Sequence, residues 1–453
     1  MKLYDKRKID FDNLLFDRKA IWALLIPLIA EQVLNSLMGM ADTMMVSRYS
    51  KEAMSAVSLV DSLNTLVIMA FDALAVGASI ICSQYIGHKD PERAKEAAEQ
   101  VTLSVTVISV ALSVILLSIR RPLLRLIFGN VEQKVMADCL AYFLLTGMSY
   151  PFIALGNAGS AIFRSTGESR FPMNVAIASN ALNIAGNALF IFVFKMGVTG
   201  AALSTLLSRI VYMTVIYAAL RKPDNIISIR NYKIKPNWEM IKRVLGIGIP
   251  SGIENGMFQF GKLVIQSSVS TLGTLAISAN AMTIILEGLN GMASGGIGLG
   301  LMTIAGQAMG AGRTEETKYY IVKLDKYSEI VMIACCALVF ILTRPVCVLA
   351  KMDPRAIEMT VGMMTFVTLV KPFVWVLSFT GPNGFRAAGD VKFPMIVSSL
   401  SMWFCRVFIT VTLIRVFHFG PIAVWIGMGC DWTVRAIIFT IRYFSGKWIK
   451  RVI

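Results

Sequence analysis

Apolar runs of about 20 or more residues recur along the whole chain, and they constrain its fold more than any other feature. Charged residues make up 16% of the 453 residues, whereas a soluble protein of this length carries about a quarter. The sequence therefore predicts an all-α polytopic membrane protein. The twelve expected membrane helices cover residues 20–46, 54–85, 98–120, 137–163, 171–194, 197–220, 241–271, 278–309, 327–345, 357–384, 392–416 and 420–444.

The connectors between these helices are short, and the longest polar one, residues 221–243, is basic and contains prolines. It predicts a hinge between two halves: an N-terminal six-helix lobe (1–220), a cytoplasmic linker (221–240) and a C-terminal six-helix lobe (241–453). The opening stretch "MKLYDKRKIDFDNLLFDRKA" is charged. It lacks the apolar core and the cleavage site of a signal peptide.

Loop charges predict the orientation in the membrane. With the N-terminus inside, the cytoplasmic segments hold roughly 28 Lys and Arg residues and the outer loops roughly 11. We therefore expect a multi-pass protein of the plasma (inner) membrane with both termini in the cytoplasm. The net charge of +16 is spread over alternate loops, so we expect no nucleic-acid partner. The seven cysteines show no metal-binding spacing, so no structural metal is expected.

The chain repeats itself at a nearly constant offset. "IPLIAEQVLNSL" at residue 26 and "IPSGIENGMFQF" at residue 249 share a proline and a glutamate in register. "GASIICSQYIGHKDPERAK" (77–95) matches "GLMTIAGQAMGAGRTEETK" (300–318), and "FRSTGESRFP" (163–172) matches "FRAAGDVKFP" (385–394). Because each half holds six helices, both halves have the same membrane orientation and form parallel, pseudo-symmetric repeats.

The first expected helix carries two acidic residues, and ionisable groups inside a membrane are by default functional candidates. Glu31 and Asp42 are eleven positions apart, so they share one helix face, about 16 Å apart. Pro27 lies one turn before Glu31, so the glutamate has two interpretations: it binds a coupling ion, or it satisfies backbone groups that the proline frees. Asp42 is either a transport carboxylate or a structural one.

Further polar residues interrupt the other apolar runs. Asn180, Asn183 and Asn187 share one face of the fifth expected helix, either as part of an ion site or as interhelical contacts. Lys262 is a candidate counter-ion for the glutamates of the second half, and Asp431 with Arg435 is predicted to form a local i, i+4 pair. The predicted buried faces hold more acids than bases. The candidate substrate-cavity residues are Gln32, Asn35, Met38, Asp61, Asn64, Glu254, Glu287 and Asn290.

Several stretches together resemble a prokaryotic member of the MATE family (multidrug and toxic compound extrusion) over about residues 20–448. They are "PLIAEQVLNSLMGMADTMMVSR", "SQYIGHKDPERA", "FRSTGESRFP", "FRAAGDVKFP" and "GPIAVWIGMGCDWTVRAIIFTIRY". The resemblance implies a V-shaped pair of six-helix lobes that export cationic, amphipathic compounds in exchange for H⁺ or Na⁺ by alternating access.

The resemblance also suggests roles for individual residues. Asp42 matches the acid of the family's first helix, while Asn187 stands where some relatives carry an acid in the fifth helix. Glu254 lies one turn before the position of a helix 7 acid, which is Phe258 here. No acid stands in "KPFVWVLSF", so a sodium site in the second half is not expected.

These observations predict a secondary antiporter that exports cationic or amphipathic small molecules. The cation-coupling candidates are Asp42, Glu31, Asn180, Asn183 and Asn187, with H⁺ or Na⁺ as the coupling ion, Na⁺ at Asp42 being one alternative. The expected partners are small-molecule substrates and membrane lipids, with no cofactor, and the protein is expected to be a monomer. A flippase of lipid-linked precursors with the same plan is the alternative. No enzyme motif or channel filter is present, so neither class is favoured.

Overall fold

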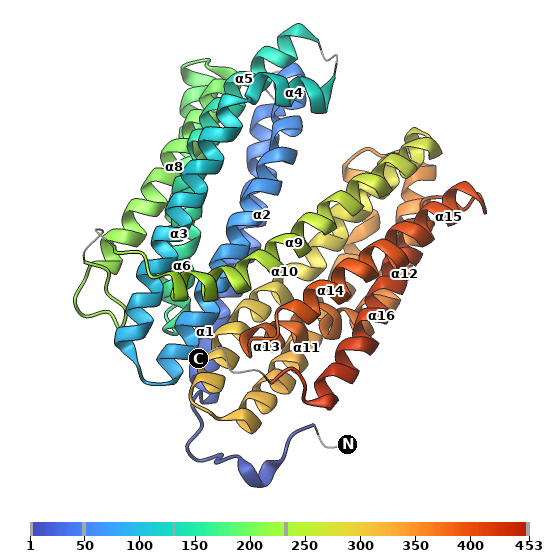
Figure 1. Cartoon of the computed structure of the whole chain (residues 1–453). Coiled ribbons are helices and arrows are strands. Elements are labelled where there is room, and N and C mark those ends of the chain that lie inside the picture. The colour runs from blue at the N-terminus through green and yellow to red at the C-terminus, as the bar shows by residue number, and fades with distance from the viewer. Residues whose placement is uncertain (1–2, 48–50, 130–131, 231–233, 450–453) are drawn as a thin grey trace. The chain divides into compact units, whose positions relative to one another are not determined.

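The computed structural model describes residues 3–47, 51–129, 132–230 and 234–449, apart from the side chains of residues 40–44, 47, 51 and 52. The described residues form helices and no strands (Figure 1). Among them, ten helices are long and apolar enough to cross a membrane, and a pair bent by 41° makes an eleventh span. Helix α9 (Trp238–Val269) occupies the remaining predicted span, and Glu254 and Lys262 make it more polar. The predicted all-α, twelve-helix fold class is confirmed.

The helices follow the predicted spans closely. The first half contains α1 (Arg18–Ser47), α2 (Lys51–Gly87), α3 (Pro91–Ser118), the short α4 (Arg120–Phe128), the bent pair α5 (Gln133–Met148) and α6 (Tyr150–Ser165), α7 (Arg170–Asn187) with the π-helical η2 (Ala188–Val193), and α8 (Gly197–Leu220). The second half contains α9, α10 (Thr274–Gly310), α11 (Thr314–Leu349), α12 (Pro354–Trp375) with η4 (Val376–Thr380) and α13 (Gly381–Ala387), α14 (Lys392–Ser401) with η5 (Met402–Phe408) and α15 (Ile409–Arg415), and α16 (Ile422–Ser445).

The sequence repeat reappears in the backbone. Helices α2 and α10 are both 37 residues long and end at matched glycines. In the matched turns "FRSTGESRFP" and "FRAAGDVKFP", Gly167 and Gly389 both have a φ of +89°. A side chain at this φ is strained, so the same turn requires glycine in each half.

The chain packs into two compact units whose boundaries differ from the predicted lobe boundaries. Unit 1 comprises residues 1–32 and 253–453, and unit 2 comprises residues 33–252. The sequence repeat divides the chain between α8 and α9, whereas packing divides it inside α1 and α9. The first part of α1 therefore belongs with the helices of the second half, and the first part of α9 belongs with those of the first half.

Small residues allow these helix segments to pack in the unit formed mainly by the other half of the sequence. In unit 1, a Cβ at Gly296 of α10 would lie 2.8 Å from the backbone of Ile29 in α1. In unit 2, a Cβ at Gly77 of α2 would lie 2.9 Å from the carbonyl oxygen of Val244 in α9. Glycine lets two helix backbones approach closely, as in other membrane helix pairs. Each half thus packs its second helix against the first helix of the other half.

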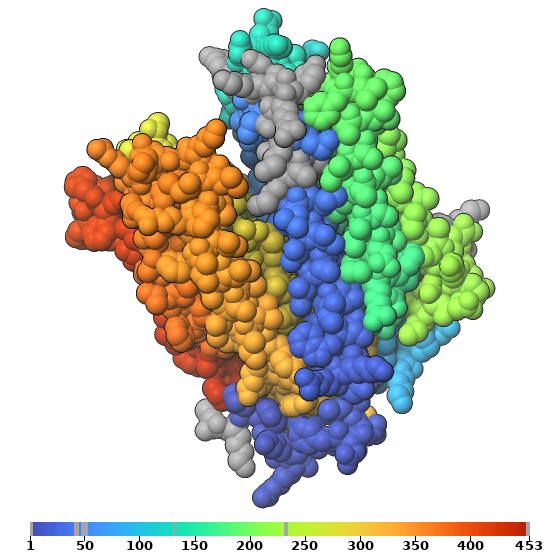
Figure 2. Space-filling model, turned by 180° about the vertical axis from the view of Figure 1, so that it is seen from behind, coloured from blue at the N-terminus to red at the C-terminus, as the bar shows by residue number. Residues whose placement is uncertain are grey.

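The core of unit 1 includes the N-terminal segment as well as α1. Leu24, Leu25 and Leu28 of α1 pack with Ile297 and Leu301 of α10. Ahead of α1, backbone N–H groups of the N-terminal segment donate hydrogen bonds to Glu315 and Glu316 at the start of α11. Figure 2 shows this segment in dark blue against the gold start of α11. These contacts anchor the N-terminus to the second half of the chain.

Candidate functional site

The three asparagines of α7 make hydrogen bonds to two neighbouring helices of unit 2, α1 and α8. Asn180 of α7 donates from Nδ2 to Oδ1 of Asn35 in α1, at 2.8 Å. One turn further along α7, Asn183 donates to Oγ1 of Thr205 in α8 at 3.3 Å. Asn187 in turn donates to Oδ1 of Asn183, also at 3.3 Å. The structure therefore brings the three predicted asparagines of α7 together with Asn35.

Helix α7 changes its geometry directly after the last of these asparagines. Asn187 is its last residue, and the π-helical η2 begins at Ala188. Asn187 is 2% exposed and Asn183 is 8% exposed. π-helical segments are frequent at functional sites, because a wider turn redirects backbone carbonyl groups. The buried amides of Asn183 and Asn187 thus lie directly before this change of helix geometry.

A second polar group of unit 2 surrounds Asp61 of α2. Its Oδ1 accepts hydrogen bonds from Nδ2 of Asn64 at 3.0 Å and from the hydroxyl of Tyr142 at 3.2 Å. Asn64 is buried and accepts a hydrogen bond from the hydroxyl of Tyr150 at 2.7 Å. Asp61 lines a cavity of about 250 Å³ together with Ser58, Ser62 and Thr65. The donors to this carboxylate are neutral.

Asp72, further along α2, is likewise bonded to a neutral group. Its Oδ1 accepts a hydrogen bond from Nδ2 of Asn157 in α6 at 2.7 Å. Asp61 and Asp72 thus accept hydrogen bonds from neutral groups and form no direct ion pair among the described residues. Such carboxylates can exchange a cation without first losing a basic partner.

Unit 1 holds Glu254 of α9 in an ion cluster. Nη2 of Arg386 contacts both carboxylate oxygens of Glu254, at 2.9 and 2.7 Å. Arg435 of α16 lies 3.7 Å from the same carboxylate. Glu254 is 7% exposed and Arg435 is 1% exposed. The glutamate is therefore a buried ion-pair partner, and both of its bases come from distant helices.

Asp431 has more partners than the predicted local pair. Arg435 is 4.0 Å away, but Arg406 of η5 is closer, at 3.2 Å, and Ser401 donates a hydrogen bond to Asp431. The guanidinium of Arg435 lies over Phe379 at 4.3 Å and over Phe258 at 5.1 Å. Phe258, which stands where the family resemblance suggested an acid, thus provides a ring face for a buried cation.

Glu287 of α10 pairs with a lysine that sequence reasoning overlooked. Nζ of Lys371 in α12 lies 2.5 Å from Oε1 of Glu287 and also donates to its backbone carbonyl at 2.9 Å. Lys371 has no exposed surface. Lys262, the predicted counter-ion, forms no ion pair within 4.0 Å among the described residues; the glutamates pair directly with Lys371 and Arg386. Asn290 is buried one turn beyond Glu287.

The remaining candidates lie on α1. Glu31 is 6% exposed in the part of α1 that belongs to unit 1, and Gln32, the next residue, is partly buried. Met38 is partly buried in the part that belongs to unit 2. The side chain of Asp42 lies outside the described residues. The predicted role of Asp42 stays a prediction from the sequence.

Within the ion pairs of unit 1, the predicted acids do not outnumber the bases. Glu254, Glu287 and Asp431 pair with four basic residues: Arg386, Lys371, Arg406 and Arg435. The prediction missed Arg386, which lies in the repeated turn block "FRAAGDVKFP". The prediction also missed Lys371 of α12. A lysine inside an apolar run, directly before Pro372, was the available signal.

The twofold architecture has a direct counterpart among known families. The model of the MatE family matches the chain twice, over residues 27–189 and 250–412. The chain belongs to the MatE family. The two matches begin at Pro27 and Pro250, the prolines of the repeated helices, so each half is one family unit. Members of this family are transporters rather than enzymes.

Relatives of the MatE family resemble the chain over nearly its whole length. The probable multidrug resistance protein NorM of Thermotoga maritima is 28% identical, and the match covers 96% of this chain and 94% of that protein. A structure titled as a MATE in complex with MaD3S matches with a TM-score of 0.88 at 21% identity, covering 94% of this chain and 96% of that one. A transporter from Pyrococcus furiosus, titled for the reverse polarity of its binding pocket, matches with a TM-score of 0.86 at 22% identity, covering 94% and 95%. The fold of this MatE chain is thus that of a multi-pass membrane transporter.

Proposed function

We propose that this MATE-type transporter is a cation-coupled antiporter that exports amphipathic, mostly cationic small molecules. The observation that carries the proposal is the different pairing of two sets of carboxylates, the acids of the ion cluster in unit 1 and the two aspartates of α2 in unit 2. In unit 1, Glu254, Glu287 and Asp431 each have a basic partner within 4.0 Å. In unit 2, Asp61 and Asp72 accept hydrogen bonds from neutral groups. A coupling ion exchanges most readily with a carboxylate of the second kind.

The energetics support this assignment. Removing one partner from a buried ion pair costs about 3–5 kcal/mol, so neutralising Glu254 or Glu287 in each cycle would be expensive. We therefore place ion coupling in the N-terminal half, with Asp42 as the ion-binding carboxylate. Asn180, Asn183 and Asn187 supply polar neighbours on α7. Glu31 belongs to unit 1, and we assign it to the bend at Pro27 rather than to the ion site.

In the proposed cycle, binding of H⁺ or Na⁺ changes the packing of α1 and favours the state that releases substrate outside. Pro27 removes one backbone hydrogen bond inside α1, so a change of bend there disturbs fewer bonds than elsewhere in the helix. In this cycle the two compact units, residues 1–32 with 253–453 and residues 33–252, act as the two bodies that alternating access requires. No cofactor is needed beyond the coupling ion.

The cationic character of the substrate is supported by the carboxylates of unit 2, especially Asp61 beside its cavity of about 250 Å³. Two of the relatives are named a probable multidrug resistance protein and a multidrug export protein, which supports the export of several different compounds. They do not favour the alternative of a lipid-precursor flippase. We further propose that the protein works as a monomer in the plasma (inner) membrane.

Transport by purified protein in proteoliposomes tests the coupling. We expect Asp42→Asn to abolish substrate uptake that is driven by an imposed pH or Na⁺ gradient, while substrate still binds. Asp224→Asn, in the exposed linker, is the matched control and should transport normally. Imposing the pH and Na⁺ gradients separately distinguishes the two ions. Normal gradient-driven transport by Asp42→Asn would contradict the proposed coupling site.

A further inference from the structure

Unit 1 contains a cavity of about 410 Å³ outside the ion cluster described above. Residues of α11, α16 and the segment from α12 to α13 form its walls, and Leu3 of the N-terminal segment closes one side. The hydroxyl of Tyr443, a wall residue, donates a hydrogen bond to the carbonyl of Leu3 at 2.7 Å. The predicted coupling site and the predicted substrate residues lie elsewhere.

Two carboxylates of α11 line this otherwise apolar cavity. Asp325 and Glu329 are four residues apart, so they lie on one face of the helix and repel each other when both are charged. Oδ1 of Asp325 is buried and has no hydrogen-bond partner among the described residues. Gly381 makes room for this side chain, because a Cβ there would lie 3.2 Å from Oδ2 of Asp325.

The bases near this cavity are largely engaged elsewhere. Lys318 pairs with Glu315 at 2.7 Å, and Lys323 lies over the ring of Tyr319 and donates to its hydroxyl. Lys326 is the basic residue that lines the cavity, and it is exposed. Neither Asp325 nor Glu329 has an ion pair within 4.0 Å among the described residues that would compensate its charge. A buried carboxylate without a partner is costly, which makes the cavity a favourable place for an external cation.

Aromatic rings face the same space. Phe385 and Phe439 lie edge to face, with ring centroids 6.2 Å apart, and Tyr443 and Phe444 continue the wall along α16. Ring faces attract organic cations, and quaternary ammonium groups in particular are held by aromatic side chains. Carboxylates beside aromatic rings are thus suited to an ammonium group that carries an apolar body.

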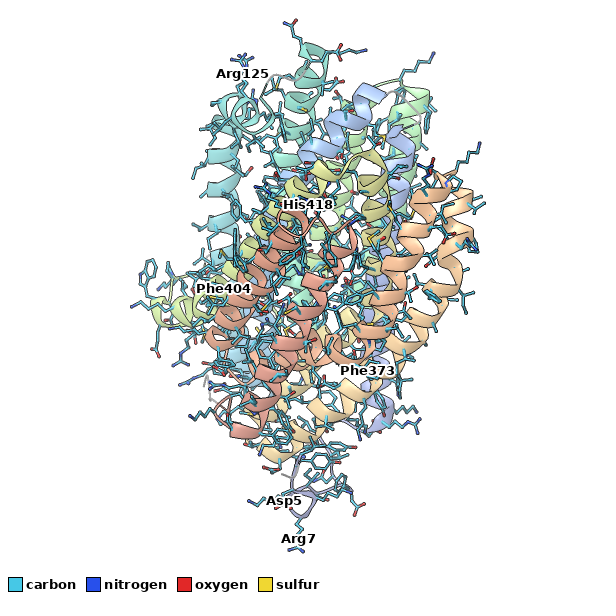
Figure 3. The ribbon with its side chains drawn as sticks, turned by 90° about the vertical axis from the view of Figure 1, so that its right-hand side faces the viewer. Asp5, Arg7, Arg125, Phe373, Phe404 and His418 are labelled. Carbon is cyan, nitrogen blue, oxygen red and sulfur yellow. The ribbon has the colours of Figure 1, made fainter. Side chains whose placement is uncertain are left out.

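The cavity borders an apolar surface of unit 1. Phe373, labelled in Figure 3, lines the cavity and is 77% exposed, and Leu377 is 42% exposed. Ile330 and Leu369 nearby in the sequence are each 65% exposed. In a membrane-spanning helix such side chains face lipid. A ligand with an apolar tail can therefore enter from the bilayer.

We propose that this cavity is a second binding site, specific for an ammonium group attached to an apolar body. Asp325 and Glu329 provide the charge complement, and the rings of Phe385, Phe439 and Tyr443 enclose the ligand. The ligand comes either from free amphipathic amines or from a lipid with an amine headgroup. The site is separate from the proposed coupling site, so its occupancy does not depend on ion-driven transport.

Photolabelling of the full-length protein in detergent tests the site. The probe is (4-benzoylbenzyl)trimethylammonium, and its uncharged analogue 4-methylbenzophenone is the control probe. We expect the cationic probe to label the cavity wall, mainly between Phe439 and Phe444, as located by mass spectrometry. Asp325→Asn combined with Glu329→Gln should lower this labelling about tenfold. Labelling by the uncharged analogue should not change.

Two further variants control the experiment. Glu358→Gln removes an exposed carboxylate that pairs with Arg344 and should label like the unaltered protein. Thr440→Lys places an ammonium group of the chain itself in the cavity and should also prevent labelling. Thermal unfolding of each variant checks that it is folded. Equal labelling of the double variant and the unaltered protein, or adducts found only outside the cavity, would overturn the proposal.

Native mass spectrometry distinguishes the two sources of the ligand. If the ligand is a lipid, the unaltered protein should retain phosphatidylethanolamine in preference to phosphatidylglycerol, and the double variant should lose this preference. If the ligand is a free amine, both proteins should retain the two lipids equally while photolabelling still differs. Because neither measurement uses an ion gradient, failure here is separable from failure of the proposed antiport.

Discussion

Glu254 of unit 1 and Asp61 of unit 2 differ in how their charge is compensated. Glu254 has the guanidinium of Arg386 on both of its oxygens, whereas Asp61 accepts bonds from an amide and a phenol. A buried pair contributes little net stability when it is complete, but losing one partner is costly because the other charge stays buried. The sequence alone identifies both residues as acids in apolar runs. Only their hydrogen-bond and ion-pair partners in the structure distinguish a carboxylate with a structural role from one that can exchange a cation.

At this scale, Glu254→Gln should destabilise the protein by about 3–5 kcal/mol, because Arg386 and Arg435 lose a buried counter-charge. The measurement is the thermal unfolding midpoint in detergent. Glu358→Gln is the matched control: both side chains of its pair with Arg344 are more than 60% exposed, so the loss should stay below about 1 kcal/mol. Removing both partners, in Glu254→Gln with Arg386→Gln, should recover part of the loss. Similar midpoints for the two single variants would contradict a buried ion cluster.

Equivalent positions of the two sequence halves form the close contacts between helices. Gly296 of α10 meets Ile29 of α1, and at the matched positions Ala73 of α2 meets Gly252 of α9. Small residues recur at these contacts because only they let helix backbones approach, and such packing holds membrane helices together where no hydrophobic effect acts between them. The apolar periodicity of a membrane helix does not reveal which partner it contacts, so the exchange of helix segments between halves was not predicted.

Adjacent glycines of α10 provide the test at the level of helices. Gly296→Ala should lower stability by about 1–3 kcal/mol, since its Cβ would lie 2.8 Å from the Ile29 backbone. Gly295→Ala has open space around its Cβ and should be neutral or stabilise the helix by up to about 1 kcal/mol. Thermal unfolding of both variants distinguishes a contact effect from a general loss of helix flexibility. Equal changes would show that α1 does not pack at Gly296.

The whole molecule consists of two units that each take one segment of a helix from the other half of the sequence. Residues 1–32 join the second half and residues around 238–252 join the first. Helices α1 and α9 each have one end in unit 1 and the other in unit 2, so a change of bend in either helix alters the packing of both units. This arrangement suits a transporter in which a change in one helix alters the whole cycle.

The predicted orientation is tested on intact cells. Glu132 in an expected outer connector and Asp224 in the linker are both exposed. With a membrane-impermeant maleimide, Glu132→Cys should be labelled and Asp224→Cys should not, until the cells are opened. The native cysteines are buried or partly buried, so the unaltered chain gives the background. Labelling of Asp224→Cys in intact cells would reverse the predicted topology.

The sequence by itself determined the number of helices, most of their boundaries and the twofold repeat. These features depend on apolar length and on short-range turn signals, such as the glycines at 167 and 389, which local residues specify. Only the tertiary structure decided which helices pack together and which base neutralises which acid. Glu254 and Arg386 are 132 positions apart, and Glu287 and Lys371 are 84 apart. Pairs at such separations are set by the packing of whole helices, which no local pattern encodes.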